Sequence, residues 1–295
     1  MTFTGTSSKK AFMGFQHEPA DSRAVVLQVP YEGTVSYMEG TAKGPGAIIS
    51  ASNQVELYDI ELDKEPALEF GIRTAEPLEP EKTSEKTMMK VRDAIGGIVR
   101  DGKFPIVFGG EHSISTGPVL ALKEKYSDLS VLQIDAHADL REEYHGDNHS
   151  HACVMARIRE QVDRAVQVGI RSMEREEMAR IKRSRLEEFV HGPDFEADKV
   201  VGQLSENVYV TIDLDGFDPS EVPGVGTPEP GGIHWKQGIE LLRKVAEKKN
   251  VVGFDIVELI PIPGSVQSEF FAAKLAYKML GYSLLRQVSG EPDSL

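Results

Sequence analysis

Three ionisable side chains, Asp135, His137 and Asp139, stand at every second position of one short segment. They follow the apolar run 131–134, which has the residue types of a buried strand. Side chains at positions i, i+2 and i+4 of an extended chain point to the same side, so these three groups converge. Because gathered carboxylates repel one another, the pattern predicts a divalent cation among them. The alternative is a chance match in a surface turn.

Two further strand-like runs end in residues of the same kinds. The run 208–212 leads into Asp213 and Asp215, again two positions apart, whereas Asp218 before a proline is interpreted as a turn residue. The run 105–108 leads through two glycines to His112, and the glycines let the backbone turn where the strand ends. Both segments therefore add candidate metal ligands.

The three segments together supply four aspartates and two histidines, more carboxylates than a single ion needs. Four carboxylates balance the charge of two divalent cations, and mixed imidazole and carboxylate ligands suit Mn²⁺. Two such ions roughly 3.5–4 Å apart lower the pKa of a shared water and orient it for attack. We therefore expect a hydrolase with two Mn²⁺ ions and a metal-bridging hydroxide.

Alternating short apolar runs and amphipathic stretches must position these side chains. The runs rich in Val and Ile predict strands at 24–29, 105–108, 131–134, 165–170, 208–212 and 251–257. Helices are predicted at 46–57, 84–100, 117–125, 152–161, 173–181, 235–248 and 268–286, and 61–83 is interpreted as a long surface loop. This alternation predicts an α/β fold, a single three-layer α/β/α domain with a mainly parallel, doubly wound sheet. Ligands bind at the carboxyl ends of strands in such sheets, which is where the ionisable segments lie.

Composition narrows the class of protein. The 295 residues carry a net charge of −14, so nucleic acid, which requires clustered Lys and Arg, is a poor partner. The chain has one cysteine and no 18-residue apolar stretch, so we expect no disulfide, no membrane partner and a cytoplasmic location. We expect one domain over 1–295, with 1–20 and 289–295 mobile.

Six segments of the chain resemble the ureohydrolase family, which includes arginases and agmatinases. The segments are GGEHS (109–113), DAHAD (135–139), SHACVMARI (150–158), TIDLDGFDP (211–219), GVGTPEPGG (224–232) and FDIVELIP (254–261). They are spread over about half of the chain in the expected order, and the N-terminal matches from Val29 and Gly40 look most like agmatinases. One departure is Glu111, where many members have Asp. The resemblance implies the arginase-like fold and a homo-oligomer, either a trimer or a hexamer.

The resemblance also implies a role for each residue that matches a family motif. His112 and Asp139 would bind one manganese, His137 and Asp215 the other, and Asp135 and Asp213 would bridge the two ions.

Two further residues would act on the substrate. Glu258 would bind the guanidinium, because a carboxylate and a guanidinium pair in a planar, bidentate way. The alternative for Glu258 is a buried structural ion pair. His151 would be the proton shuttle to the leaving amine, while His145 and His149 are interpreted as solvated loop residues. Cys153 fits a buried residue better than a nucleophile.

The predicted reaction is hydrolysis of a cationic guanidino compound to urea and an amine, with agmatine giving putrescine as the first choice. Arginase or guanidinobutyrase activity would share the chemistry, but a carboxylate-bearing substrate needs a cation at the pocket rim. Arg141, Arg157 and Arg171 are the arginines that could supply one. A catalytically inactive, metal-binding regulatory protein and a deacetylase-like hydrolase are the alternatives from other classes.

Overall fold

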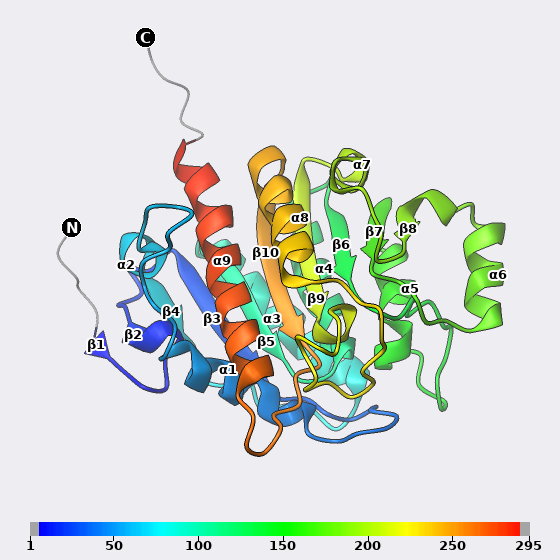
Figure 1. The fold of residues 1–295 in the computed structure, drawn as a ribbon, viewed down its shortest axis with the longest axis horizontal. Helices are drawn as coiled ribbons and strands as arrows, with labels where there is room; N and C mark the ends of the chain where they lie inside the picture. Colours follow the sequence, from blue (N-terminus) through cyan, green and yellow to red (C-terminus); the bar gives the residue numbers. More distant parts are fainter. Residues whose placement is uncertain (1–5, 290–295) are drawn as a thin grey trace, which may run out of the picture.

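A parallel eight-stranded sheet forms the centre of the computed structural model, which describes residues 6–289 (Figure 1). Its strand order is β4-β3-β5-β10-β9-β6-β7-β8, and every pairing within it is parallel. The strands are β3 Ala24–Val29, β4 Ile72–Thr74, β5 Phe104–Gly109, β6 Ser130–Ile134, β7 Arg164–Val168, β8 Val190–His191, β9 Asn207–Asp213 and β10 Asn250–Val257. Two short strands, β1 Thr6–Ser7 and β2 Phe15–Gln16, pair antiparallel in a separate sheet.

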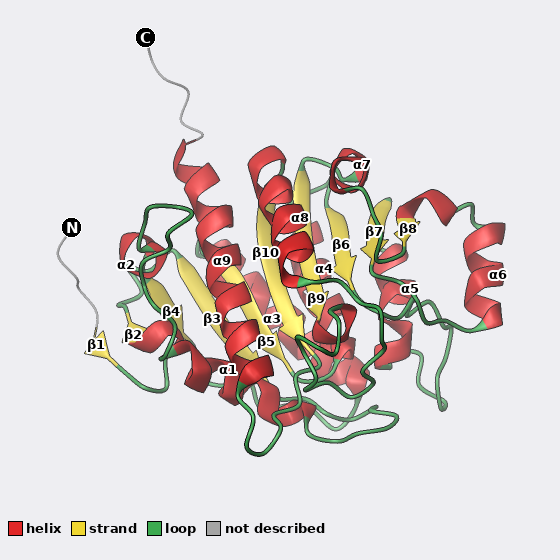
Figure 2. Ribbon diagram, in the orientation of Figure 1, coloured by secondary structure: helices red, strands yellow, loops and turns green. Residues whose placement is uncertain are grey.

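Helices cover both faces of the large sheet (Figure 2). Their bounds are α1 Gly44–Ser52, α2 Pro66–Phe70, α3 Ser84–Arg100, α4 Thr116–Lys123, α5 Val154–Arg159, α6 Arg175–Arg183, α7 Ala197–Gln203, α8 Trp235–Lys248 and α9 Gln267–Ser289. One face packs against α1, α7, α8 and α9, and the other against α3, α4 and α5. This arrangement confirms the predicted three-layer α/β/α fold with a parallel sheet.

Both faces of the central strands are covered, and most of their residues are apolar. In β10, Phe254 and Ile256 belong to the core on the α9 side, whereas Val252 and Val257 belong to the core on the α3 side. Near-continuous Val, Ile and Leu runs, rather than an alternation with polar residues, are what a doubly covered sheet requires. This composition explains why the central strands were predictable to within about two residues at each end.

The order of the central strands brings the chemistry together. β5, β10, β9 and β6 are consecutive neighbours, and each of them is followed directly by one of the segments singled out above. Because all four strands are parallel, their carboxyl ends lie at the same edge of the sheet. The segments therefore meet there, although up to 146 positions separate residues that touch.

Elements also form where the sequence predicted none. The segment 61–83, interpreted as a surface loop, contains α2 and β4, because Ala67, Phe70 and Ile72 are buried in the core. β8 and α7 were also not predicted, since both are short and flanked by polar residues. In the N-terminal part, Phe12 is completely buried and stacks edge-on against Phe108 of β5.

The expectation that 1–20 and 289–295 are mobile falls partly on 1–5 and 290–295, which lie outside the described residues. The prediction of one domain over the whole chain stays a prediction for the same reason. Among the described residues, no helix is both long and apolar enough to span a bilayer.

Candidate active site

His112 reaches the edge of the sheet through a tight turn after β5. Gly110 lies so close to the preceding loop that an added Cβ would stand 2.0 Å from the carbonyl oxygen of Tyr31. Glycine is therefore required at this position for steric reasons. The chain then begins a 3-10 turn, His112–Ser115, which directs the imidazole of His112 inward, where it is 1% exposed.

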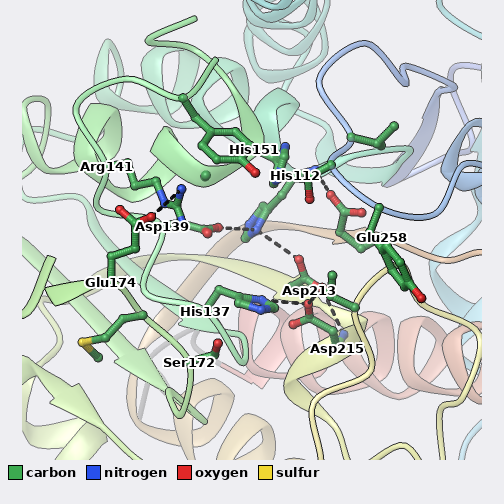
Figure 3. A pocket seen from close by; sticks show the side chains of 18 of the residues that line it. His112, His137, Asp139, Arg141, His151, Ser172, Glu174, Asp213, Asp215 and Glu258 are labelled. Carbon is green, nitrogen blue, oxygen red and sulfur yellow. Dashed lines mark hydrogen bonds and ion pairs between the residues drawn. The ribbon is translucent and has the colours of Figure 1, made fainter. Parts of the chain in front are cut away.

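The structure brings the six predicted metal ligands together at the carboxyl ends of β5, β6 and β9. Figure 3 labels five of them, and the sixth, Asp135, is in contact with both histidines. His112 Nδ1 lies 3.1 Å from Asp135 Oδ2, 3.2 Å from Asp139 Oδ2 and 3.3 Å from Asp213 Oδ2. These three oxygens surround a single ring nitrogen.

A second group forms around the other histidine. His137 Nδ1 lies 2.9 Å from Asp215 Oδ2 and 3.6 Å from Asp135 Oδ1. His112, Asp135 and Asp213 form one set of atoms with metal-ligand spacing, and Asp135, His137 and Asp215 form another. Asp135 belongs to both sets, as a bridging carboxylate would. The assignment of each ligand to one ion stays a prediction.

The hydrogen bonds around His112 fix which of its nitrogens faces the carboxylates. The Thr211 hydroxyl donates to Asp255 Oδ1 at 2.7 Å, so its oxygen accepts from His112 Nε2–H at 2.9 Å. Nδ1 then carries the lone pair, and it is buried with no hydrogen-bond partner in the described structure. A buried lone pair that faces three carboxylate oxygens without a hydrogen bond fits a nitrogen that ligates a cation.

The electrostatics of the site point the same way. Burial alone would lower the pKa of His112, but the three nearby aspartates raise it well above its usual value. Burial would also lower the pKa of His137, yet chiefly the charge of Asp215 raises it to about 12. Burial and then the charge of Asp135 raise the pKa of Asp139 to about 7. Without a metal the site must hold protons to limit the repulsion, and two divalent cations remove that need.

Glu258 follows β10 directly and turns back over the site. Its backbone φ of 65° is in the left-handed region, which is unusual for a glutamate and indicates a conformation imposed by the surroundings. The backbone N–H of Glu258 donates to Gly110 O at 2.8 Å, and Glu258 Oε1 accepts from His112 N–H at 2.6 Å. Burial raises the pKa of this carboxyl well above its usual value. No Lys or Arg within the described range 6–289 forms an ion pair with it, contrary to the structural alternative.

His151 begins the 3-10 turn His151–Cys153 and lines the same cavity near His112 (Figure 3). Its Nδ1 is 3.1 Å from Thr34 Oγ1, and no protein partner is recorded for Nε2 among the residues described. Burial, followed by the charges of His112 and His137, lowers the pKa of His151 to about 4. The imidazole is therefore neutral at neutral pH and can accept a proton.

These residues line a cavity of about 270 Å³. Its walls include five of the six predicted ligands, all but Asp135, together with Glu258 and His151. The ring of Tyr144 stands edge-on to His151, with centroids 5.6 Å apart, and narrows one side. A concave, partly apolar site with convergent polar groups and shifted pKa values has the features of an enzyme active site.

Comparison with known proteins places the chain in a family. Residues 22–281 match the model of the Arginase family. The chain belongs to this family. It is 42% identical to an N(1)-aminopropylagmatine ureohydrolase from Synechocystis sp., covering 89% of this chain and 90% of that protein. It is 37% identical to an agmatinase from Pyrococcus horikoshii, covering 89% and 93%.

Solved structures agree with this assignment. The crystal structure of an agmatine ureohydrolase from Thermoplasma volcanium superposes with a TM-score of 0.87 at 30% identity and covers 97% of both chains. The ureohydrolase resemblance, the arginase-like fold and a hydrolase acting on guanidino compounds are thus confirmed. The dependence of the arginase family on two metal ions also agrees with the Asp and His cluster.

Among the described residues, three charged side chains line the cavity besides the predicted site residues. Arg141 was named from the sequence only as a possible cation at the pocket rim, and Glu174 and Glu177 were not identified. Arg141 Nη1 lies 3.0 Å from Glu174 Oε1, and its guanidinium stands over the ring of Tyr144 at 4.5 Å. Glu174 follows β7 by a few residues, so the carboxyl-end rule could have suggested it. Thr34 was also missed, because nothing in the sequence links it to His151.

Several other residues are structural. Arg171 donates to backbone carbonyls of the loops after β9, including Asp215 O at 2.8 Å, and Arg157 pairs with Glu142 and Glu160. Asp218 caps a turn by accepting from Ser220, Gly231 and Gly232, as interpreted from the sequence.

Cys153 is completely buried, and burial followed by the charge of Asp139 raises the pKa of its thiol to about 11. A neutral, inaccessible thiol does not act as a nucleophile.

Proposed function

We propose that the protein hydrolyses the guanidino group of agmatine to urea and putrescine, using two Mn²⁺ ions held by the six ligands. The single observation that carries the proposal is Glu258, a partly buried carboxylate that lines the cavity beside the ligand cluster and forms no ion pair with a Lys or Arg among residues 6–289. Such a carboxylate favours a guanidinium, which pairs with it through two parallel hydrogen bonds. Pairing at this position sets the central guanidinium carbon over the metal cluster.

The residues present fit the two metals. Four aspartates balance two divalent charges, and the unpartnered Nδ1 of His112 supplies a neutral nitrogen ligand. When bound, the ions supply Lewis acidity and an activated water as nucleophile. Mixed oxygen and nitrogen ligands support Mn²⁺ among the divalent ions.

The chain's own groups then orient the substrate and move protons. Glu258 holds the guanidinium, and the turn that contains Gly110 and His112 fixes the position of its carboxylate. His151 lines the same cavity with a free Nε2, from which a proton can pass to the amine nitrogen as the C–N bond breaks.

The remaining charges of the cavity favour an amine at the far end of the substrate. Once the aspartates are balanced by metal, Glu174, Glu177 and Glu258 stand against Arg141, which leaves a net formal charge of −2. Agmatine carries two positive charges and matches this value. An α-carboxylate or a terminal carboxylate would need a free cation, whereas Arg141 is already paired with Glu174. These features disfavour arginine and 4-guanidinobutanoate.

A second substrate, N1-aminopropylagmatine, is supported by the 42% identity to the Synechocystis enzyme of that name. This compound has the same guanidino end as agmatine and a longer chain with one more amine, so its hydrolysis would yield urea and a triamine. The added length extends towards the outer part of the cavity, where Tyr37 and Met38 are exposed on the 33–39 loop.

The test is urea release by manganese-reconstituted protein with four substrates: agmatine, N1-aminopropylagmatine, arginine and 4-guanidinobutanoate. We expect the two amines to have kcat/KM values at least about a hundredfold above those of the two acids, because an unpaired buried charge costs several kcal/mol. Preference for an acid would overturn the substrate class. Release of no urea from any of the four, with two metals bound, would favour the inactive regulatory alternative.

The expected assembly is a further proposal. Native mass spectrometry of the metal-loaded protein is expected to give a trimer or a hexamer, and a monomer would contradict that expectation.

A further inference from the structure

Glu111 is a completely buried carboxylate whose side chain is not one of the predicted metal ligands and takes no part in the proposed chemistry. Its Oε2 accepts the backbone N–H groups of Gly33 at 2.8 Å and Thr34 at 2.6 Å. Its Oε1 accepts the hydroxyls of Thr34 at 2.6 Å and Ser113 at 2.7 Å. The four donors satisfy an ionised carboxylate, and they attach the 33–39 loop to the turn that contains His112.

Thr34 connects this carboxylate to His151. The Thr34 hydroxyl has a single hydrogen, which it gives to Glu111, so its oxygen can only accept from its other neighbours. Those neighbours are the backbone N–H of His151 and the ring Nδ1 of His151, both at 3.1 Å. The ring nitrogen must therefore carry a hydrogen. The lone pair of the neutral imidazole is then on Nε2, which is free of protein partners among the described residues.

We propose that Thr34 and Glu111 are positioning residues that fix His151 as the Nδ1–H tautomer, with Nε2 as the atom that moves the proton. This inference rests on the proposed function for the role of His151. In that reaction the bond between the guanidino carbon and the amine nitrogen breaks, the water oxygen becomes the urea oxygen, and both water protons end on the amine. Nε2 accepts one of these protons and passes it to the amine nitrogen, so the imidazole ends neutral as it began.

Glu111→Gln gives the sharpest test, because it preserves size and reverses the two hydroxyl hydrogen bonds to Oε1, those of Thr34 and Ser113. The two backbone N–H groups can only donate, so the amide oxygen must take the place of Oε2. The amide NH₂ then faces Thr34 Oγ1 and donates to it. The Thr34 hydroxyl must turn its hydrogen towards His151 Nδ1, which stabilises the opposite tautomer, with the hydrogen on Nε2.

The measurement is a long-range ¹H–¹⁵N spectrum of ¹⁵N-histidine protein loaded with diamagnetic Zn²⁺, with His151→Gln used to assign the signals. In the wild-type protein the His151 ring is expected to carry its hydrogen on Nδ1. In Glu111→Gln it is expected to carry it on Nε2, and in Thr34→Val the two tautomers are expected to be mixed. In the Mn²⁺ enzyme, both variants are expected to lose about tenfold to a hundredfold in kcat with KM within about threefold. Thr34→Ser keeps the hydroxyl and is expected to recover most of the rate.

Thr74→Val is the matched control. Thr74 lies in the edge strand β4, far from the site, and its Oγ1 accepts a hydrogen bond from the buried backbone N–H of Phe12. The substitution is expected to lower stability without changing kcat or the tautomer. A wild-type ring with hydrogen on Nε2, or a Glu111→Gln ring unchanged from wild type, would overturn the proposal. The spectrum reports the tautomer of His151 without any turnover. A failure of the proposed reaction would therefore appear in the urea assay and leave the tautomer measurement unaffected. If Thr34→Val does not fold, Glu111→Gln alone decides.

Discussion

Thr211→Val is expected to weaken metal binding although Thr211 touches no metal. Its hydroxyl joins Asp255 to His112, through bonds of 2.7 and 2.9 Å, and all three side chains are essentially inaccessible to solvent. Valine has the same shape but no hydroxyl, so it leaves Asp255 Oδ1 without its donor and His112 Nε2–H without its acceptor. His112 then gains little from keeping its hydrogen on Nε2, and the lone pair on Nδ1 is no longer fixed.

The magnitude follows from these two groups. A buried polar group left unsatisfied costs about 1–3 kcal/mol, so the two together cost about 2–6 kcal/mol, divided between protein stability and metal affinity. Loss of a partner that orients a metal ligand typically reduces affinity by about tenfold to a hundredfold. That range corresponds to about 1.4–2.8 kcal/mol, which is within the total. We therefore expect Kd for Mn²⁺ to rise by about tenfold to a hundredfold.

Isothermal titration of Mn²⁺ into chelator-treated protein measures the change in Kd. A thermal melt without metal measures the part of the cost that falls on protein stability. Tyr209→Phe is the matched control, because it removes the 2.6 Å bond to the other oxygen of Asp255 and leaves the bond to His112 intact. It is expected to lower Tm with a smaller effect on Kd. Folded Thr211→Val protein with wild-type Kd and kcat would refute the argument that Thr211 sets the tautomer of His112.

Three further predictions follow from the site. Glu258→Gln should reduce kcat/KM for agmatine by at least about a hundredfold while both metals stay bound, because the charged pair between the carboxylate and the guanidinium is lost. Unchanged kinetics would contradict the role of Glu258 in binding the guanidinium. Removal of metal by a chelator should lower Tm by about 5 °C relative to protein with Mn²⁺ at 100 times Kd, since such binding stabilises by about 2.7 kcal/mol. The same Tm with and without the ion would mean that the cluster binds no metal. The raised thiol pKa of Cys153, about 11, leaves little thiolate at pH 7, so alkylation by iodoacetamide should be slow and should accelerate as the pH rises towards 11. Cys153→Ala is expected to retain urea release, and its loss would argue for a thiol role.

The hydrophobic pattern was sufficient to predict the central strands and the longest helices. Runs such as 24–29 and 84–100 were predicted with the bounds that the structure has, because a doubly covered sheet requires mostly apolar strands and a long helix repeats its apolar face. Short elements were not predictable in this way. β4 and β8 contain three and two residues, too few for a periodicity, and their existence depends on neighbours distant in the chain.

The types of the metal ligands were likewise predicted from the sequence, and Asp135, His137 and Asp139 do converge at the end of β6. The extended conformation that this prediction assumed is not observed, because β6 ends at Ile134 and Asp139 has a left-handed φ of 51°. The spacing at the end of β9 also predicted Asp213 and Asp215, although Asp215 lies in a 3-10 turn, Leu214–Gly216, and not in the strand. Family motifs added Glu258 and His151, which isolated positions would not have revealed. What the sequence determined by itself is therefore the kind of chemistry, through local spacing and the apolar strands that carry it.

Tertiary structure alone decided how that chemistry is controlled. The strand order places β10, which Glu258 follows, between β5, which leads to His112, and β9, which ends at Asp213, and no local rule specifies that order. Hydrogen bonds between residues 99 and 117 positions apart set the tautomers of His112 and His151, through Thr211 and Thr34. A hydroxyl can donate only one hydrogen, so its direction depends on which carboxylate the fold brings beside it, and that proximity exists only in three dimensions.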